Sequence, residues 1–319
     1  MFYLLRELKM RPVVSGALSF IPGLYSWWDR RRPMGNTASA RYARSIWKFH
    51  LANYRRFIGD HIPETVAELG PGASLGSCIS ALCDGVNQAI ALDVCPYADN
   101  NLLNLKLLDE LTVGSNSAAR YLPLRDAILH LCEANDRTLL KYVAPWTDIK
   151  ALPACSVDFV FSHSVMEHIT TPLAAYKACF HWLKPGGIMS HKIDHSSHAI
   201  TRSWNGHYAI PRILWAIICG KRPYLLNRMT PSQHEEAIRL AGFQVLSKEL
   251  VVADQNDKNS TCDRIAMRPE YQVKTSTFIC QRPSVASGDV PETVERIVEV
   301  AAPFACMRCS DPCTARAAA

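Results

Sequence analysis

The chain has 319 residues, of which 48% are hydrophobic and 20% are charged, and its formal net charge is +6. This composition is typical of a protein with a folded core, and the length allows one large α/β domain with additional segments. Three of the excess positive charges come from the run Arg30–Arg32, and no basic stripe interleaved with aromatic residues occurs beyond the N-terminal segment. A long nucleic acid is therefore not an expected partner.

Twelve cysteines are spread along the chain, and no secretory signal accompanies them. This distribution predicts thiols in a reducing compartment rather than a disulfide framework, so we expect a cytoplasmic protein. Cys306, Cys309 and Cys313 form one dense group in an Ala-rich tail. A metal held by these thiols and a fourth ligand is the alternative reading, but we expect residues 284–319 to be a weakly structured tail.

An apolar run, VVSGALSFIPGLYSWW, begins at Val13 and is followed by the sequence DRRR. It is shorter than the roughly 20 apolar residues that span a bilayer, and the charged residues before it do not form a signal-peptide pattern. We expect residues 1–59 to be a helical segment that docks on the following domain or on a partner subunit. The alternative is peripheral contact of residues 13–32 with the inner face of a membrane, with Trp27 and Trp28 at the headgroups.

The apolar periodicity predicts strands that alternate with helices. A helix is expected over residues 38–57, where apolar side chains recur at helical spacing. The expected strands are residues 65–69, 89–93, 139–143, 157–162, 188–193, 244–252 and 274–281. Between them we expect helices at 75–83, 173–183 and 232–241, a turn at 184–187, and insertions at 100–135, mostly helical, and at 194–230, irregular. The alternation predicts a doubly wound, mainly parallel α/β sheet within residues 60–283.

The first expected strand runs into the sequence Glu68-Leu69-Gly70-Pro71-Gly72. In doubly wound sheets the ligand lies outside the carboxyl ends of the strands, and glycines let the backbone turn and approach a ligand closely. Asp93 follows about twenty residues later, at the end of the second strand, where an acid suits the two hydroxyls of a ribose. These residues predict a cofactor pocket at this edge of the sheet.

A dinucleotide such as NAD fits this turn poorly. Its fingerprint requires a glycine where Leu75 stands, Pro71 stiffens the turn, and Glu68 would repel a pyrophosphate. A cationic cofactor without phosphate fits better. An NAD-dependent oxidoreductase is the less favoured alternative.

Four stretches, VAELGPGASLG, AIALD, DIKALPACSVDFVFSHSVMEHI and WLKPGGIMSHKID, occur in the order that they take in class I S-adenosylmethionine-dependent methyltransferases. The chain resembles this family over about residues 63–283. The resemblance implies a Rossmann-like fold, methyltransferase activity and S-adenosylmethionine as cofactor. One departure is Ser74, which stands where the family commonly has a third glycine; Gly76 follows two residues later, and the path of the turn stays open.

The resemblance also implies which residues contact the cofactor. They are Glu68, Gly70, Pro71 and Gly72 at the methionine portion, Asp93 at the ribose, Asp148 and Ile149 at the adenine, and Ser162 and His163 where cofactor and acceptor meet.

Three later stretches, SHKIDHSSH, WNGHYA and GKRPYLLNR, resemble a branch of these enzymes found in sugar modification and in polysaccharide or secondary-metabolite biosynthesis. This likeness favours O-methylation of a sugar or another small polar metabolite. N-methylation is the next alternative, and a non-catalytic protein that binds the cofactor is another.

Methylation of a hydroxyl group requires removal of its proton, and histidine is suited to that task because its pKa lies near neutral pH. His191, near the end of the fifth expected strand, and Asp194 predict a histidine–carboxylate pair at the acceptor. His198 is a further catalytic candidate, and His195 is a weaker one. His168 is expected to pack beneath the site.

His191, His195 and His198, taken with Asp194, could instead be read as a set of metal ligands. Neighbouring positions of a strand point to opposite faces, and the spacing matches no strong metal-binding pattern. The sequence therefore predicts a site without a metal.

The irregular stretch supplies the candidates for acceptor binding. Trp204, Asn205 and His207 are expected at a sugar-binding surface, because aromatic faces stack on sugar C–H groups and polar groups recognise hydroxyls. Arg222 and Arg228 would hold a phosphate or carboxylate group of the acceptor. The structural alternatives are a small core around Trp204 and solvated charge for the two arginines.

Overall fold

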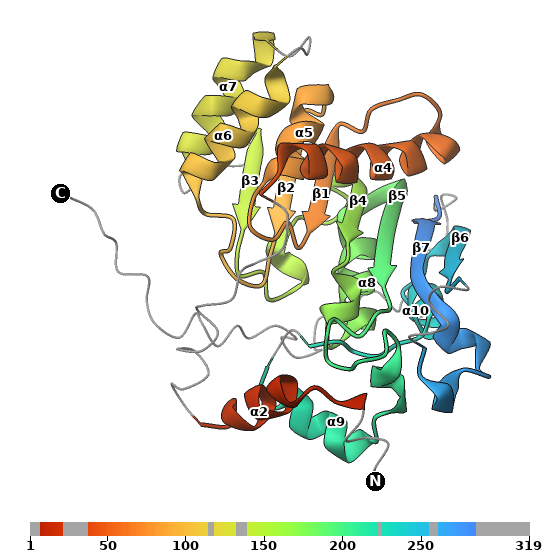
Figure 1. Ribbon diagram of the computed structural model, residues 1–319. Helices are drawn as coiled ribbons and strands as arrows, with labels where there is room; N and C mark the ends of the chain where they lie inside the picture. The colour runs from red at the N-terminus through yellow and green to blue at the C-terminus, as the bar shows by residue number, and fades with distance from the viewer. Residues whose placement is uncertain are drawn as a thin grey trace, which may run out of the picture.

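The computed structural model describes residues 7–21, 38–113, 118–131, 139–222, 225–254 and 261–284. Seven strands form one sheet in the order β3-β2-β1-β4-β5-β7-β6 (Figure 1). All of them are parallel except β7, which runs antiparallel to both β5 and β6. The strands are β1 Thr65–Leu69, β2 Gln88–Leu92, β3 Leu140–Val143, β4 Val157–His163, β5 Leu183–Asp194, β6 Gln244–Val252 and β7 Val273–Gln281. The predicted doubly wound fold is confirmed.

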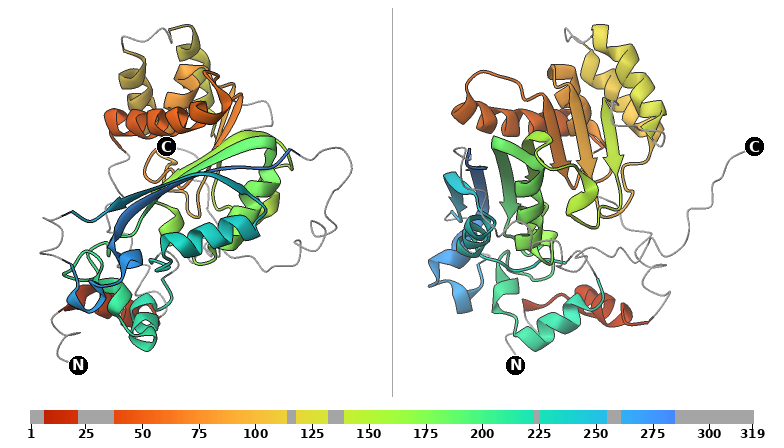
Figure 2. Two further views of the ribbon diagram at one scale, coloured as in Figure 1. Left: turned by 90° about the vertical axis from the view of Figure 1, so that its right-hand side faces the viewer. Right: turned by 180° about the vertical axis from the view of Figure 1, so that it is seen from behind.

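Helices cover both faces of the sheet (Figure 2). One face carries α4 Ala40–Ile58, α5 Gly76–Asp84, α6 Asn101–Thr112 and α7 Ala118–Leu129. The other face carries α8 Pro172–Trp182 and α10 Pro231–Leu240. The β1–β2–β4 centre of the sheet is therefore buried on both sides, as expected for parallel strands that read as continuous apolar runs.

Helix α4 lies on a face of the sheet. Ser39 caps its first turn by accepting a hydrogen bond from the backbone N–H of Tyr42. Its central residue, Trp47, is fully buried and packs against Phe159 and Phe161 of β4, with ring centroids 6.5 and 5.8 Å apart. This packing joins the N-terminal helix to the core of the domain.

The boundaries of α10 and α5 follow local signals. Thr230 and Gln233 form a capping box at the start of α10, each side chain accepting from the backbone N–H of the other residue. α5 ends at Gly85, which is left-handed with φ +119°. Because both signals are short-range, the predicted ends of these helices lie within one residue of the observed ones.

One expectation about secondary structure is refined and two others are corrected. The long helical stretch at 100–135 contains two helices, α6 and α7. The turn expected at residues 184–187 belongs to the first part of β5, which pairs with β4 across an irregularity. The insertion at 194–230 contains an unpredicted helix, α9 Arg212–Cys219.

The N-terminal segment forms a helix, α2 Met10–Leu18, which packs side by side with α9 below the carboxyl ends of the strands (Figures 1 and 2). A Cβ on Gly16 would collide with backbone oxygens of α9, so the two helices approach closely. Leu8, Ile200, Ile210, Ile218 and Leu226 form a small core there, separate from the sheet. Trp27, Trp28 and the cysteines of the tail lie outside the described residues. Within the described residues, every helix is too short or too polar to cross a membrane.

Candidate active site

The glycine turn after β1 is compact and lies close to the segment that follows β4. Gly70 and Gly72 are left-handed, with φ +65° and +75°. The N–H of Gly70 donates to the carbonyl of Leu92 at 2.8 Å, which ties the turn to the end of β2. A Cβ on Gly70 would lie 2.6 Å from Cγ2 of Val165, so only glycine fits without displacing this side chain.

Ser74 and Gly76 settle the path of the turn into α5. Ser74 is buried, and its hydroxyl accepts from the N–H of Gly76 at 3.3 Å. A Cβ on Gly76 would lie 2.7 Å from Cβ of Ala43, so this glycine allows α5 to pack tightly on α4. The glycine therefore serves helix packing, two residues later than the commoner position.

Glu68 lies in β1, just before the turn, and its side chain reaches the start of α5. Its carboxylate is buried and accepts hydrogen bonds from the hydroxyl of Ser77, at 2.5 and 2.6 Å, and from the thiol of Cys78, at 3.2 Å. Burial raises the pKa of Glu68 to about 7. Glu68 thus supports the glycine turn from below.

Asp93 follows β2 and faces the turn. Its carboxylate accepts from the backbone N–H groups of Val94, at 2.7 Å, and Gly72, at 3.4 Å. Only 5% of the residue is exposed, and burial raises its pKa to about 7. The carboxylate is therefore fixed at the bend where a ribose would need an acceptor.

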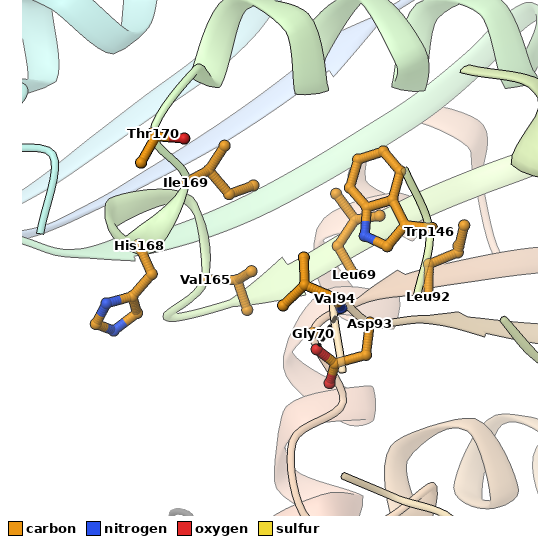
Figure 3. A pocket seen from close by; sticks show the side chains of 10 residues that line it. All are labelled: Leu69, Gly70, Leu92, Asp93, Val94, Trp146, Val165, His168, Ile169 and Thr170. Carbon is orange, nitrogen blue, oxygen red and sulfur yellow. Dashed lines mark hydrogen bonds between the residues drawn. The ribbon is translucent and has the colours of Figure 1, made fainter. Parts of the chain in front are cut away.

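A cavity opens between the glycine turn, the end of β2 and the segment after β4, with about 420 Å³ of empty space that includes the open solvent at its mouth (Figure 3). Its walls are mostly apolar, and Asp93 and His168 are its ionisable side chains. It is lined by Leu69, Gly70, Leu92, Asp93, Val94, Trp146, Val165, His168, Ile169 and Thr170. An apolar pocket with a few fixed polar groups at the carboxyl ends of parallel strands is typical of a cofactor site.

Trp146 forms the wall where the adenine contact was expected at Asp148 and Ile149. Its ring packs on Trp182, with centroids 5.3 Å apart, and its backbone N–H donates to the carbonyl of Asp93 at 2.9 Å. Asp148 is exposed and caps the next turn through the N–H of Lys150. The carbonyl of Ile149 accepts from the indole of Trp182 at 2.6 Å.

Trp146 in the wall was not predicted from the sequence, which indicated Asp148, two residues later, instead. Val94 and Val165 were missed as well, since single aliphatic residues carry no chemical signal. The ends of β2 and β4, which lie just before Val94 and Val165, do indicate where the pocket is.

His191 and Ser162 point into the core rather than into the cavity. The hydroxyl of Ser162 and Nδ1 of His191 are 2.7 Å apart, and both residues are fully buried beneath the sheet. The ring of His191 contacts Tyr176 of α8, and burial lowers the pKa of His191 to about 3. The predicted pair of His191 with Asp194 is wrong, because alternate positions of β5 face opposite sides of the sheet.

His163 lies on the other face, under α4. Its Nδ1 is 3.4 Å from Nε2 of His50, and its ring meets Tyr42 and Phe49 edge-on. Burial, together with the charge of Lys192, lowers the pKa of His163 to about 4. Ser162 and His163 thus diverge from the end of β4, and neither lines the cavity.

Asp194 pairs with His198 instead. Oδ2 of Asp194 and Nε2 of His198 are 3.2 Å apart, and Oδ1 accepts from the N–H of Ser196 at 2.8 Å. Burial acts to raise the pKa of Asp194, but the hydrogen bonds from His198 and Ser196 outweigh it and lower the pKa. The ring of His198 lies 4.9 Å from that of His168, which lines the cavity. An acid–base cluster therefore stands at the edge of the pocket.

The polar groups predicted to bind an acceptor are bonded within the insertion. The amide of Asn205 is buried, donates to the carbonyl of Tyr271 and accepts from the N–H of Cys262, both at 2.9 Å. Trp204 donates from its indole to the hydroxyl of Thr261 at 3.0 Å. His207 is buried against Tyr208, with ring centroids 4.1 Å apart. The contacts of Trp204, Asn205 and His207 are therefore those of a small structural core around Trp204, which was the alternative to a sugar-binding surface.

Arg222 and Arg228 also donate hydrogen bonds to backbone carbonyls. Arg222 is buried and donates to the carbonyl of Pro12, which joins α9 to α2. Arg228 donates to the carbonyls of His207 and Ile210, at 3.2 and 2.7 Å. The expectation that these guanidinium groups grip a phosphate or carboxylate of the acceptor is corrected, because both are engaged inside the insertion.

Cysteines in the described residues follow the expectation of buried thiols only in part. Cys78, Cys179 and Cys280 are buried thiols, whereas Cys95, two residues after Asp93, is in a disulfide.

Residues 68–190 match the sequence profile of a family described as a methyltransferase domain. The matched segment begins at Glu68 and ends in β5, so it includes the glycine turn, Asp93 and the segment that carries His168. The protein therefore contains a class I S-adenosylmethionine-dependent methyltransferase domain, and S-adenosylmethionine is its cofactor. No curated protein matches the chain.

Several solved structures are similar to this chain at low sequence identity. An S-adenosylmethionine-dependent methyltransferase from Mesorhizobium loti is 16% identical with a TM-score of 0.43, over 76% of this chain and 100% of that one. Phosphoethanolamine N-methyltransferase 2 from Haemonchus contortus, in complex with S-adenosyl-L-methionine, is 15% identical with a TM-score of 0.42, over 74% and 53%. Geranyl diphosphate methyltransferase in complex with SAM is 10% identical with a TM-score of 0.43, over 76% and 85%. Sequence identities and TM-scores this low do not indicate which acceptor this protein methylates.

Proposed function

We propose that the protein transfers a methyl group from S-adenosylmethionine to a hydroxyl oxygen of a small polar metabolite such as a sugar. The observation that carries the proposal is the hydrogen bond between Asp194 and His198 beside His168, at the edge of the cofactor cavity. A hydroxyl oxygen attacks well only after its proton is lost, and a carboxylate-backed imidazole can assist that loss. The sugar class is suggested by the resemblance of the second half of the chain to sugar-modifying enzymes.

Several residues at the cavity suit the cofactor. The bound cofactor supplies a methyl group on a positively charged sulfur. Gly70 and Val165 pack together in the cavity wall, and the Asp93 carboxylate can accept hydrogen bonds from two ribose hydroxyls. Trp146 and Val94 provide apolar walls that exclude water. The chain contributes mainly orientation, because methyl transfer is an in-line displacement that depends on the alignment of its partners.

N-methylation is the competing proposal. An amine acceptor that is already neutral needs little help from a base, so it would make the Asp194–His198 pair dispensable. The two reactions therefore differ in how they respond to loss of His198.

We expect His198→Ala to lower kcat for hydroxyl acceptors by about 10²–10⁴, the usual contribution of acid–base catalysis, with the affinity for S-adenosylmethionine unchanged. The measurement uses labelled methyl donor with nucleotide sugars, lipid-linked sugars, phenols and amines, and detects methylated products by mass. His130→Ala is a matched control, because His130 pairs with Asp126 at the same i, i+4 spacing but is exposed and lies just after α7. Methylation of amines alone, at equal rates in both variants, would show that the acceptor atom is nitrogen.

A further inference from the structure

We propose that Glu167, His168 and His198 form a binding site for a divalent transition-metal ion at the edge of the cofactor cavity. One ligand atom from each residue lies within 4.8 Å of the other two. Two imidazoles and one carboxylate are a donor set that suits zinc and its neighbours in the first transition series. Glu167 and His168 follow β4, whereas His198 follows β5, so the fold assembles the site from two loops.

Glu167 is the strongest indication of a missing ligand. The residue is only 3% exposed, and neither carboxylate oxygen has a hydrogen-bond partner in the described part of the chain. A buried carboxylate without a partner is strongly unfavourable. A cation at this position would satisfy it.

Asn227 fixes the turn that carries Glu167. The N–H of Asn227 donates to the carbonyl of Glu167 at 2.8 Å, and its side-chain amide donates to the carbonyls of Met166 and Ile169 at 2.7 and 2.9 Å. The backbone of the turn is therefore held, which fixes the position from which the Glu167 side chain extends toward the cluster.

His198 is arranged as metal-binding imidazoles usually are. Its Nε2 pairs with Asp194, and a carboxylate on one ring nitrogen commonly orients the other nitrogen toward a metal. His198 and Ala199 both have positive φ, +46° and +62°, a strained conformation that is found mainly at functional sites. Two ligands of one metal lie at most about 4.2 Å apart, twice the metal–nitrogen bond, so modest rotation of the side chains closes the site.

The ligand set differs from the one that the sequence offered. His191 bonds to Ser162 inside the core, and His195 lies 2.8 Å from the hydroxyl of Ser276. Both rings are therefore engaged by other partners and do not join His198 in the proposed ligand set. Spacing along β5 gave no metal pattern because the true neighbours of His198 come from the segment after β4.

The role of the ion in catalysis rests on the proposed function. A hydroxyl group of the acceptor bound to the ion would become more acidic. With the ion bound, His198 would act as a ligand rather than as the base, and the proton would pass to water. The oxygen lone pair then forms a bond to the methyl carbon, the carbon–sulfur bond breaks, and its electron pair stays on sulfur as a neutral thioether. His168 lies both in the ligand set and in the cavity wall, so the ion would stand next to the reacting methyl group.

The test is calorimetric titration of metal-stripped protein with Zn²⁺ and with Mn²⁺, without cofactor or acceptor. We expect one ion per chain, and at least tenfold weaker binding in Glu167→Gln and in His198→Ala. Asp194→Asn should weaken binding about 10–100-fold, as loss of a carboxylate behind a metal ligand usually does. His130→Ala again serves as control, and thermal melting shows that each variant is folded.

The outcomes separate the two proposals. Absence of binding to the wild type, or equal affinity in Glu167→Gln and His198→Ala, would overturn the metal site whatever the enzyme methylates. Metal binding together with methylation of nitrogen only would support the site and overturn the hydroxyl acceptor.

A second inference rests on the outer face of α2 and α9. Apolar side chains of α2, of the residues that follow it and of α9 are exposed, and Ile213 is 81% exposed. The other exposed members are Met10, Val14, Phe20, Ile21 and Ile217. We call this set the α2–α9 patch. Clusters of exposed apolar residues on one face commonly mark an interaction surface.

Exposed basic residues accompany the patch: Lys9 and Arg11 near α2, and Arg212 and Lys221 at the two ends of α9. An amphipathic helix face with flanking cations binds the boundary between headgroups and acyl chains, most strongly where the lipids are anionic. We infer that the α2–α9 patch docks on an anionic lipid surface. The helices lie below the carboxyl ends of the strands, so docking would bring the catalytic edge toward the membrane (Figure 1).

Co-sedimentation with vesicles of phosphatidylcholine, with and without phosphatidylserine, tests this inference. We expect wild-type protein to bind the anionic vesicles at least tenfold more strongly, and Ile213→Asp to lose that binding. Leu102→Asp is the matched control, because Leu102 is also 81% exposed but lies on α6. Equal binding by all three proteins would overturn the inference. So would a wild-type dimer that Ile213→Asp converts to a monomer, since the patch would then bind a second copy.

Discussion

Replacement of Gly70 by alanine should abolish measurable cofactor binding while leaving the protein folded. Gly70 has φ +65°, which costs an L-residue about 1–2 kcal/mol. The new Cβ would also lie 2.6 Å from Val165, a residue that lines the cavity. Relief requires movement of the turn or of the cavity wall, and either movement changes the shape of the cofactor pocket.

Calorimetry with S-adenosylmethionine and with its demethylated product measures the effect, and Gly85→Ala provides the comparison. Gly85 is also left-handed, at φ +119°, but a Cβ there would only reach ordinary contact with Ile62 at 3.4 Å. We expect Gly85→Ala to lower the thermal stability and to keep the cofactor affinity. A double variant of Gly70→Ala with Val165→Ala should recover part of the binding, because it removes the collision but not the strain. Full affinity in Gly70→Ala alone would contradict the position of the pocket.

Asp93→Asn should lower the affinity for S-adenosylmethionine about 10–100-fold, the usual value of hydrogen bonds to a charged group, about 1.5–3 kcal/mol. It should also remove a pH dependence. Burial raises the pKa of Asp93 to about 7 in the empty protein, so the carboxyl group is mostly protonated at pH 6. Ribose hydroxyls donate to the ionised form, so wild-type affinity should rise as pH rises from 6 to 8.

The raised pKa of Asp93 has the opposite effect on folding: as pH rises, the cofactor affinity rises but the free energy of unfolding falls. Between the unfolded pKa of Asp93 and about 7, the native protein binds more protons than the unfolded chain, so its free energy of unfolding falls as pH rises. Without cofactor, Asp93→Asn should therefore gain stability relative to the wild type between pH 6 and 8. Glu68, whose pKa burial also raises to about 7, remains in both proteins and cancels in the comparison. An affinity that is independent of pH in wild-type protein would show that the ribose does not meet this carboxylate.

The sheet could be predicted from the sequence because its signals are local. The residue bounds of β1 and β6 agree with the prediction, since each strand is a short run of strand-forming residues between turn signals. The glycine turn and Asp93 were found for the same reason. Their chemistry depends on where strands end, and strand ends are visible in the apolar pattern.

The partners of the histidines could not be predicted in this way. His191 and Asp194 are three positions apart on β5, and the alternation of the strand sends them to opposite faces. Asp194 meets His198 only because the backbone turns back through residues with positive φ, which no residue type announces there. Glu167 joins them from a different loop.

The prediction of acceptor-binding residues in the insertion at 194–230 was wrong for a related reason. Asn205 looked available for a ligand, but it bonds to Tyr271, 66 residues further along the chain. Arg222 likewise bonds to Pro12, 210 residues before it. A polar side chain in a sequence carries no sign of the distant carbonyl that will engage it.

The contact between α2 and α9 has a consequence for synthesis on the ribosome. α2 leaves the exit tunnel early, but the helix that covers its inner face is made about two hundred residues later. At about 5–20 residues per second, Leu8 and the close-packed face at Gly16 wait on the order of ten seconds or more for their neighbour. A nascent chain stalled before residue 212 should therefore present α2 to chaperones or to lipid, and release it only when α9 emerges.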